Sequence, residues 1–266
     1  MLSITDSEKG EFIRILATDW AAKYQTTYRR AVAFQSDYCS DPRAGTEYFL
    51  QNGFERSGGG RAGYNHRAIE ALNACVTLAA GYESFLKSPT AQNELWSKFE
   101  SFCKRDGIGL NRQNNEGVIR GVIELAKESG LMGSNPFTGL ASLTPNNVYE
   151  AWRRVRMMKG IGDKLASFLI RDIVSIMGCE SSVPKDQRIF LQPIDGWVRT
   201  TCQLLWDFSE RIPDWVLSAK VVLECDRLGL SAIGFNQGAW MYGPHKVGGT
   251  TDRLKENIET ATWREI

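Results

Sequence analysis

Apolar residues recur along most of this chain at spacings of three and four, the period of an amphipathic α-helix. Leu95, Trp96, Phe99 and Phe102 show the pattern plainly. The alternation of apolar and polar residues that is typical of strands is nearly absent. The sequence therefore predicts an all-α protein. The main predicted helices span residues 11–34, 66–87, 146–157, 163–177, 195–206, 213–225 and 231–241.

Two segments break this period. Residues 41–65 contain Ser57-Gly58-Gly59-Gly60 and are expected to form a loop between helical blocks. Residues 178–193 are expected to form a long connection, with a short extended piece at 188–191.

The composition excludes several kinds of site. The net charge of +1 gives no overall positive field, which argues against binding of nucleic acid through a charged tail but leaves room for a local basic site. The 6 cysteines lie far apart and only 2 histidines are present, so we expect no metal and no organic cofactor. There is no signal-like start and no apolar run of the roughly 18 residues a membrane helix needs. We expect a cytoplasmic protein, nucleoid-associated if the source is prokaryotic.

The segment 159–171, KGIGDKLASFLIR, predicts a tight hairpin between two helices. Gly160 and Gly162 allow the turn and let a phosphate approach the backbone closely. A helix begins directly after them, so its first amides and its positive dipole end face the same point. Ile161 is expected to point inward and join the two helices.

Basic side chains surround this hairpin. Lys159, Arg156 and Arg171 supply the local charge that binding of a DNA backbone requires. An ordinary corner between two helices would also use a glycine-rich turn. Regular apolar positions on both helices favour the DNA-binding interpretation. We therefore assign the backbone contacts to Lys159, Gly160, Ile161, Gly162, Arg156 and Arg171.

Together with residues 191–206, LQPIDGWVRTTCQLLW, the hairpin resembles the helix-hairpin-helix superfamily of base-excision DNA glycosylases. The segments NELWSKFESF and FNQGAWMYG, and the 31 residues from Lys164 to Asp195, are most similar to the archaeal 8-oxoguanine DNA glycosylase branch. The resemblance spans about residues 66–243. It implies a two-lobed all-α fold, with one lobe formed by 1–65 plus 194–266 and the other by 66–193, the hairpin lying at 146–177.

The resemblance implies that Lys164 and Asp195 are catalytic. Lys164 matches the nucleophilic lysine of bifunctional members, which attacks C1′ and forms a Schiff base. Such an amine must lose its proton, and we expect Arg171 and the helix N-terminus to favour that loss. Asp195 matches the essential aspartate, which stabilises positive charge on the sugar. Taken separately, the two residues would be a surface lysine and an ordinary helix cap.

The resemblance also suggests a pocket for a flipped base. Trp96 and Trp240 are candidates for the two stacking faces, although either is equally explained as a core residue. Asn236 lies one helical turn before Trp240, where we expect a carboxylate in the archaeal branch; Gln237 is a further candidate contact. The excised base is therefore either 8-oxoguanine or another modified base.

These features predict a monomeric bifunctional DNA glycosylase/AP lyase that acts on double-stranded DNA containing an oxidised purine or another modified base, without cofactor or membrane. Three alternatives remain. One is a monofunctional glycosylase for another modified base, and one is a non-catalytic helix-hairpin-helix protein that only binds DNA. The third is a helical protein–protein adaptor with an incidental Gly-Ile-Gly turn.

Overall fold

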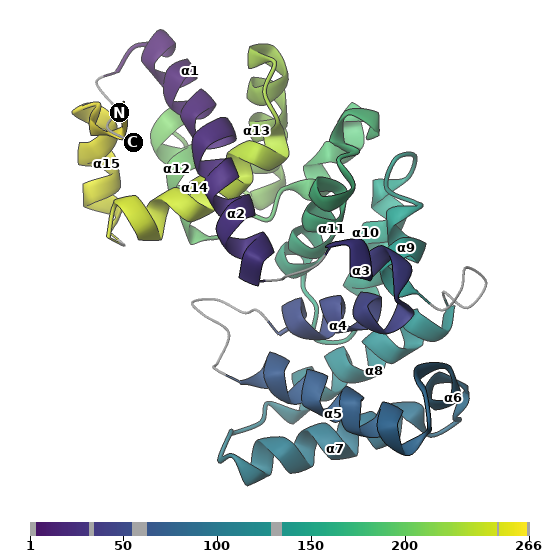
Figure 1. Cartoon of the computed structure of the whole chain (residues 1–266). Helices are drawn as coiled ribbons and strands as arrows, with labels where there is room; N and C mark the ends of the chain where they lie inside the picture. Colours follow the sequence, from purple (N-terminus) through teal and green to yellow (C-terminus); the bar gives the residue numbers. More distant parts are fainter. Residues whose placement is uncertain (1–3, 32–34, 55–62, 129–134, 249, 265–266) are drawn as a thin grey trace. The chain divides into compact units, whose positions relative to one another are not determined.

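The computed structural model describes residues 4–31, 35–54, 63–128, 135–248 and 250–264. Within these ranges all regular structure is helical and no strand occurs, which confirms the all-α prediction (Figure 1). None of these helices combines the length and the apolar character that crossing a membrane requires.

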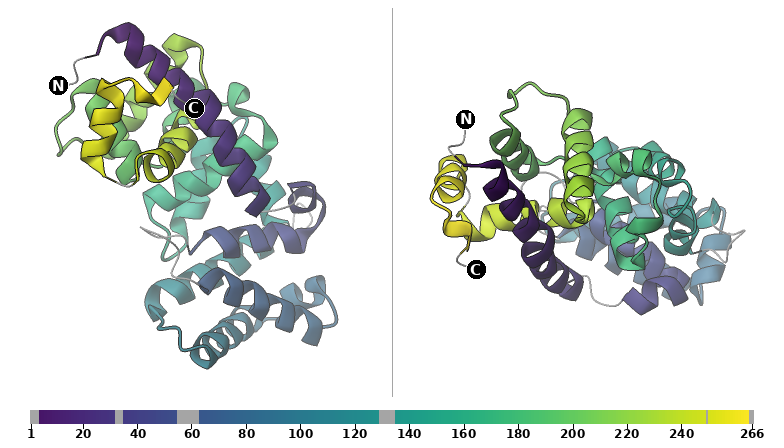
Figure 2. Two further views of the ribbon diagram at one scale, coloured as in Figure 1. Left: turned by 60° about the vertical axis from the view of Figure 1, so that its left-hand side comes forward. Right: turned by 90° about the horizontal axis from the view of Figure 1, so that it is seen from above.

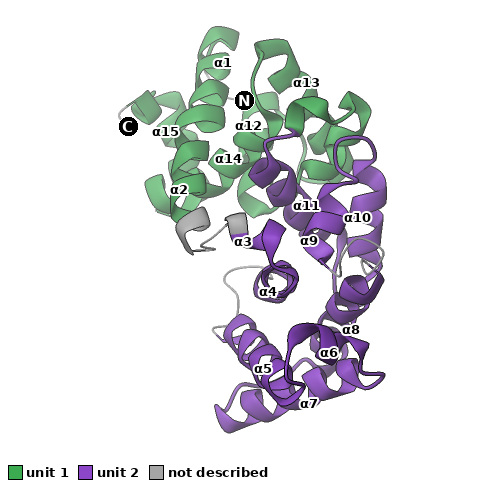
Figure 3. Ribbon diagram, turned by 45° about the vertical axis from the view of Figure 1, so that its right-hand side comes forward, with its two compact units in different colours: residues 1–33, 180–266 green, residues 34–179 purple. Residues whose placement is uncertain are grey.

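The chain divides into two compact units, which Figure 3 distinguishes by colour. The terminal unit comprises residues 1–33 and 180–266, and the central unit comprises residues 34–179.

The described residues of the terminal unit form six α-helices, one π-helical turn and three 3-10 segments. They are α1 (Asp6–Ile15), the π-helix η1 (Leu16–Trp20), α2 (Ala21–Ala31), η3 (Glu180–Ser182), η4 (Lys185–Leu191), α12 (Gly196–Trp206), α13 (Asp214–Leu228), α14 (Ala232–Lys246), α15 (Thr251–Glu259) and η5 (Thr262–Arg264). The helices of the central unit are α3 (Gln35–Ser40), α4 (Pro42–Asn52), α5 (Tyr64–Leu78), α6 (Tyr82–Lys87), α7 (Ala91–Arg105), α8 (Arg112–Glu128), α9 (Pro136–Ala141), α10 (Val148–Met157) and α11 (Asp163–Met177).

The boundaries between the units differ from the predicted lobes. Both termini lie in one unit, as expected, but the breaks fall at 33/34 and 179/180 and not at 65/66 and 193/194. The reason for the first difference is α4, which packs on α5, α8 and α9 of the central unit. Its Tyr48 hydroxyl donates to the Leu169 carbonyl over 2.8 Å, and its ring meets Phe137 edge-on. The second difference follows from Arg188, which pairs with Asp226 of α13 at 3.1 Å.

Two predictions of irregular structure were wrong. Residues 42–52 form α4 and not a loop, because Asp41 caps the helix by accepting from the Arg43 amide and Pro42 suits its first turn. The glycine run 57–60 lies outside the described residues. The expected extended piece at 188–191 belongs to the 3-10 segment η4.

The core of the terminal unit depends on a close approach between α14 and η1. Two glycines one turn apart, Gly234 and Gly238, face the backbone of η1, and a Cβ at Gly238 would overlap the carbonyl of Leu16. Trp20 and Tyr242 meet edge-on at 5.1 Å across this contact. Figure 2 shows the purple N-terminal helices crossing the yellow-green α14 within this unit.

Replacement of Gly238 by alanine tests this contact. The added methyl has no space against backbone atoms, so we expect Gly238→Ala to lower the free energy of unfolding by about 1–3 kcal/mol, despite the better helix propensity of alanine. Gly196→Ala is the matched control, because nothing lies within 4 Å of its Cβ position. It should change stability by less than about 0.5 kcal/mol. Urea unfolding followed by circular dichroism measures both, and equal stabilities would contradict the contact.

Candidate functional site

The hairpin of the central unit has the predicted form. α10 ends at Met157, and Gly160 takes the left-handed conformation with φ of 94°. The Ile161 amide donates to the Met158 carbonyl over 3.0 Å and closes the turn. Ile161 is buried, as expected, and α11 begins directly after Gly162. The indole of Trp152 ties the two helices together by donating to Ser167 Oγ over 3.0 Å.

Helix α8 packs closely against this hairpin at two of its glycines. A Cβ at Gly117 would overlap the carbonyl of Lys159, and one at Gly121 would run into the side chain of Met158. The two glycines are four residues apart and therefore lie on one face of α8. The sequence reasoning missed them, although their spacing was a signal for a close helix contact.

The N-terminus of α11 is open to solvent. Its cap residue is Gly162, so no side chain satisfies the first amides of the helix. Gly162 is exposed, and nothing lies within 4 Å of its Cβ position. Lys159 and Lys164 are exposed on either side of it. This arrangement of backbone amides and cations suits a phosphate group.

Arg156 braces the hairpin. Its guanidinium donates to the Ile161 carbonyl over 3.1 Å and forms an ion pair with Asp163. The side chain stays 45% exposed, which leaves part of it accessible to a ligand. Arg156 therefore holds the turn in shape as well as contributing charge.

Other arginines of α10 are engaged with Glu150. Arg153 donates to its carboxylate at 2.8 and 2.9 Å, and Arg154 at 2.9 Å. These hydrogen bonds, the one from Arg153 first, lower the pKa of Glu150 to about 2. One carboxylate thus offsets part of the positive charge of this helix.

The prediction that Arg171 contacts DNA is wrong. Only 1% of the residue is exposed, and its guanidinium pairs with Asp172 at 2.8 Å and lies over the ring of Phe168. The cause is the burial of α11 on nearly all sides between Leu165 and Val174. A charge in such a place needs an internal partner and is not presented to a ligand.

In the terminal unit, the loop 192–195 leads into α12. Asp195 caps this helix by accepting from the Val198 amide over 2.8 Å. The loop backbone is held from two other helices. Ser218 Oγ of α13 donates to the Gln192 carbonyl over 3.4 Å, and Asn236 Nδ2 of α14 donates to the Pro193 carbonyl over 3.1 Å. Asp195 therefore sits on a well-supported loop.

The proposed base-pocket residues are mostly buried. Asn236 and Gln237 are 0% and 1% exposed, and Gln237 accepts from Gln25 over 3.1 Å. Trp240 is partly exposed and meets Tyr24 edge-on at 5.6 Å. Trp96 is 5% exposed in the central unit, where its ring packs against Phe99 at 5.7 Å, as a core residue does.

The predicted site residues thus form two groups. The hairpin of the central unit carries Lys159, Gly162 and Lys164. Trp96 lies elsewhere in the same unit. The loop and α14 of the terminal unit carry the other group, which consists of Asp195, Asn236, Gln237 and Trp240.

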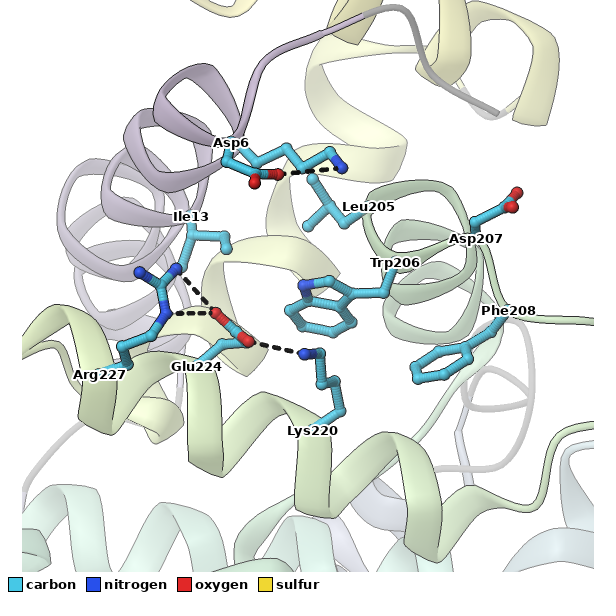
Figure 4. A pocket seen from close by; sticks show the side chains of 10 residues that line it. Asp6, Ile13, Leu205, Trp206, Asp207, Phe208, Lys220, Glu224 and Arg227 are labelled. Atoms are coloured by element: carbon cyan, nitrogen blue, oxygen red, sulfur yellow. Dashed lines mark hydrogen bonds and ion pairs between the residues drawn. The ribbon is translucent and has the colours of Figure 1, made fainter.

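The terminal unit also has a surface cavity of about 590 Å³ between α1, α12 and α13 (Figure 4). Trp206 projects into it, and Glu224 pairs there with Lys220 at 2.6 Å and with Arg227 at 2.9 Å. Its charges are thus largely satisfied by one another. None of the predicted site residues lines it. Across the described part of the chain, no group of histidine, cysteine, aspartate or glutamate residues is arranged to hold a metal ion.

Comparison with protein-family models, with curated proteins and with solved structures found no match. The residues of the hairpin and of the loop 192–195 are therefore the basis for assigning a function.

The contact from Asn236 to the loop predicts a pH-dependent defect in Asn236→Asp. Burial raises the pKa of an introduced carboxyl group above its unfolded value of about 3.9, so its cost to stability grows as pH rises from that value through the folded pKa. We expect a deficit of about 1–3 kcal/mol at pH 4.5, where a protonated acid can still donate to Pro193, and a larger one at pH 8.

Urea unfolding at both pH values measures this defect relative to the wild type. Asn236→Leu is the control, because its deficit should be the same at both pH values. A stability of Asn236→Asp equal to that of the wild type at pH 8 would contradict the buried contact.

Proposed function

We propose that the protein is a bifunctional DNA glycosylase/AP lyase of the two-lobed helix-hairpin-helix type. It removes an oxidised purine such as 8-oxoguanine, or another modified base, from double-stranded DNA. The observation that carries this proposal is the hairpin itself, with its uncapped helix start between Lys159 and Lys164.

The hairpin binds the DNA backbone through a phosphate. The first amides of α11 lack a side-chain cap, and the helix dipole favours an anion at this point. Lys159 and Lys164 add positive charge beside it. The absence of a side chain at Gly162 permits the phosphate to reach the backbone. Such a contact fixes the position of the DNA without reading its sequence.

Lys164 supplies the nucleophile. The target base leaves the duplex stack, because C1′ of its nucleotide is inaccessible within it. The neutral amine bonds to C1′ as the glycosidic bond breaks, and the base departs with the bonding electrons and takes up a proton. The sugar ring then opens to a Schiff base. Loss of a proton from C2′ expels the 3′ phosphate and nicks the strand.

Asp195 stabilises the positive charge that develops on the sugar. Its carboxylate lies at the start of α12, where the helix dipole favours the ionised form. The hydrogen bonds that hold the loop 192–195 keep this carboxylate in a fixed position. Asn236 contributes to that support by donating to the Pro193 carbonyl. We expect a carboxylate at this position in the archaeal branch. The asparagine therefore affects the support of the loop as well as the choice of base.

Borohydride trapping tests the nucleophile. When the protein is incubated with duplex DNA containing 8-oxoguanine, sodium borohydride should reduce the Schiff base and leave a covalent protein–DNA adduct. Lys164→Ala should abolish the adduct, whereas Lys104→Ala, which changes an exposed lysine on α7, should form it like the wild type. Asp195→Asn should bind DNA but lose excision by roughly 100-fold or more.

The pattern of adducts separates the alternatives. An adduct with an abasic site but not with 8-oxoguanine would direct the search to other modified bases. Base excision without any adduct would show a monofunctional glycosylase. Binding of DNA with neither excision nor adduct would contradict the proposed enzymatic activity. It would indicate a protein that only binds DNA.

Gly162→Ala separates phosphate binding from folding. Because the Cβ position is in open space and φ at Gly162 is −94°, the fold should tolerate the methyl group, with a stability change below about 0.5 kcal/mol. The same methyl group obstructs a phosphate, so affinity for undamaged duplex should fall by roughly tenfold. Gly109→Ala, whose Cβ position is also open, should change neither quantity. Fluorescence anisotropy measures the affinity, and unchanged binding by Gly162→Ala would exclude the hairpin as the phosphate site.

A further inference from the structure

Gln192 places a buried primary amide on the loop that carries Asp195. The residue is only 3% exposed. Within the part of the chain that the structure describes, neither its Nε2 nor its Oε1 has a hydrogen-bond partner. Buried polar groups are nearly always paired, because an unpaired one gives up its hydration without compensation. An amide with both ends unpaired therefore indicates a partner from outside the chain.

The loop around this amide is held firmly while the amide itself is unused. Ser218 Oγ donates to the Gln192 carbonyl, and Asn236 Nδ2 donates to the carbonyl of the next residue, Pro193. Pro193 also fixes its own φ angle. Three residues after Gln192, Asp195 is anchored at the start of α12. The side chain of Gln192 is thus a polar group of this loop that is left for a ligand, and the backbone that carries it is already held in place.

The geometry points to Gln192 as the residue that reads the edge of the excised base, an inference that rests on the proposed function. A primary amide offers an acceptor beside a donor. It pairs at both ends with a base edge that carries an N–H beside a carbonyl, as the N1–H and O6 of a guanine-type base or the N7–H and O8 of 8-oxoguanine do. A base without such an edge leaves the buried amide unpaired and is rejected.

Gln192→Met tests this role, because methionine has a similar length and lacks both polar atoms. In the free protein it replaces an unpaired buried amide, so the urea midpoint should rise. Excision of 8-oxoguanine in single-turnover kinetics should fall by roughly tenfold or more. Affinity for undamaged duplex should stay within about twofold of the wild type, because the hairpin is unchanged.

Gln203→Met is the matched control in the same unit. Gln203 Nε2 donates to the Ser209 carbonyl over 3.2 Å, so its loss should lower the urea midpoint and leave excision unchanged. The opposite signs of the two stability changes identify Gln192 as the unpaired amide.

Three results would overturn the inference. Excision by Gln192→Met within about twofold of the wild type would show that the amide does not read the base. A fall in its urea midpoint would show that the amide is already satisfied in the free protein, for example by a bound water. Absence of excision by the wild type on every modified base tested would overturn the proposed function, and this inference with it, and is distinguishable from the other two results.

Discussion

The close contact between α8 and the hairpin is the constraint on which the candidate site depends. At Gly117 the backbone of α8 approaches the Lys159 carbonyl so closely that no side chain fits, and at Gly121 it meets Met158. Arg156 completes the support from the other helix by binding the Ile161 carbonyl. Arg156 also pairs with Asp163, the first residue of α11, while the cap residue Gly162 stays exposed. What remains open there is a set of backbone amides, which is the chemistry that a phosphate requires.

The first amides of the helices in this protein are either capped by a side chain or left without such a cap. The start of α12 is satisfied internally by Asp195, which accepts from the Val198 amide. The start of α14 is satisfied by Ser231 and by Glu180, which accepts from the Ile233 amide over 3.0 Å. The starts of α5, α7 and α13 lack a capping side-chain hydrogen bond, and so does the start of α11, where the cap residue Gly162 is exposed. Relative to a serine, threonine, asparagine or aspartate cap, the glycine cap of α11 costs about a few tenths of a kcal/mol. The exposed Lys159 and Lys164 flank it in the sequence. A negatively charged ligand bound at this point would compensate for that loss.

Much of the fold was predictable because helical periodicity is a local property of sequence. The bounds predicted for the two helices of the hairpin, 146–157 and 163–177, agree closely with α10 and α11. The glycine run 57–60 indicates a loop and favours that prediction for the whole of residues 41–65, although Asp41-Pro42 is a good start for the helix α4.

The candidate site was less predictable, because burial and pairing depend on tertiary packing. The charge of Arg171 was evident from sequence, but its location in the core beside Asp172 was not. The contact between Asn236 and the Pro193 carbonyl joins residues 43 positions apart. Gln192 gave no signal at all in the sequence, since an amide is recognised as unpaired only when its surroundings are known. The spacing of Gly117 and Gly121 was, by contrast, a readable signal for close packing.

We propose that the uncapped start of α11 binds a DNA phosphate. The decisive test of this contact is an NMR titration. Protein labelled with ¹⁵N is titrated with a short undamaged duplex, and the backbone amide resonances are followed. We expect the largest chemical-shift changes at Gly162, Asp163 and Lys164, and we expect these changes to weaken as the salt concentration rises. Binding that leaves these three amides unshifted, or no salt-dependent binding at all, would contradict it.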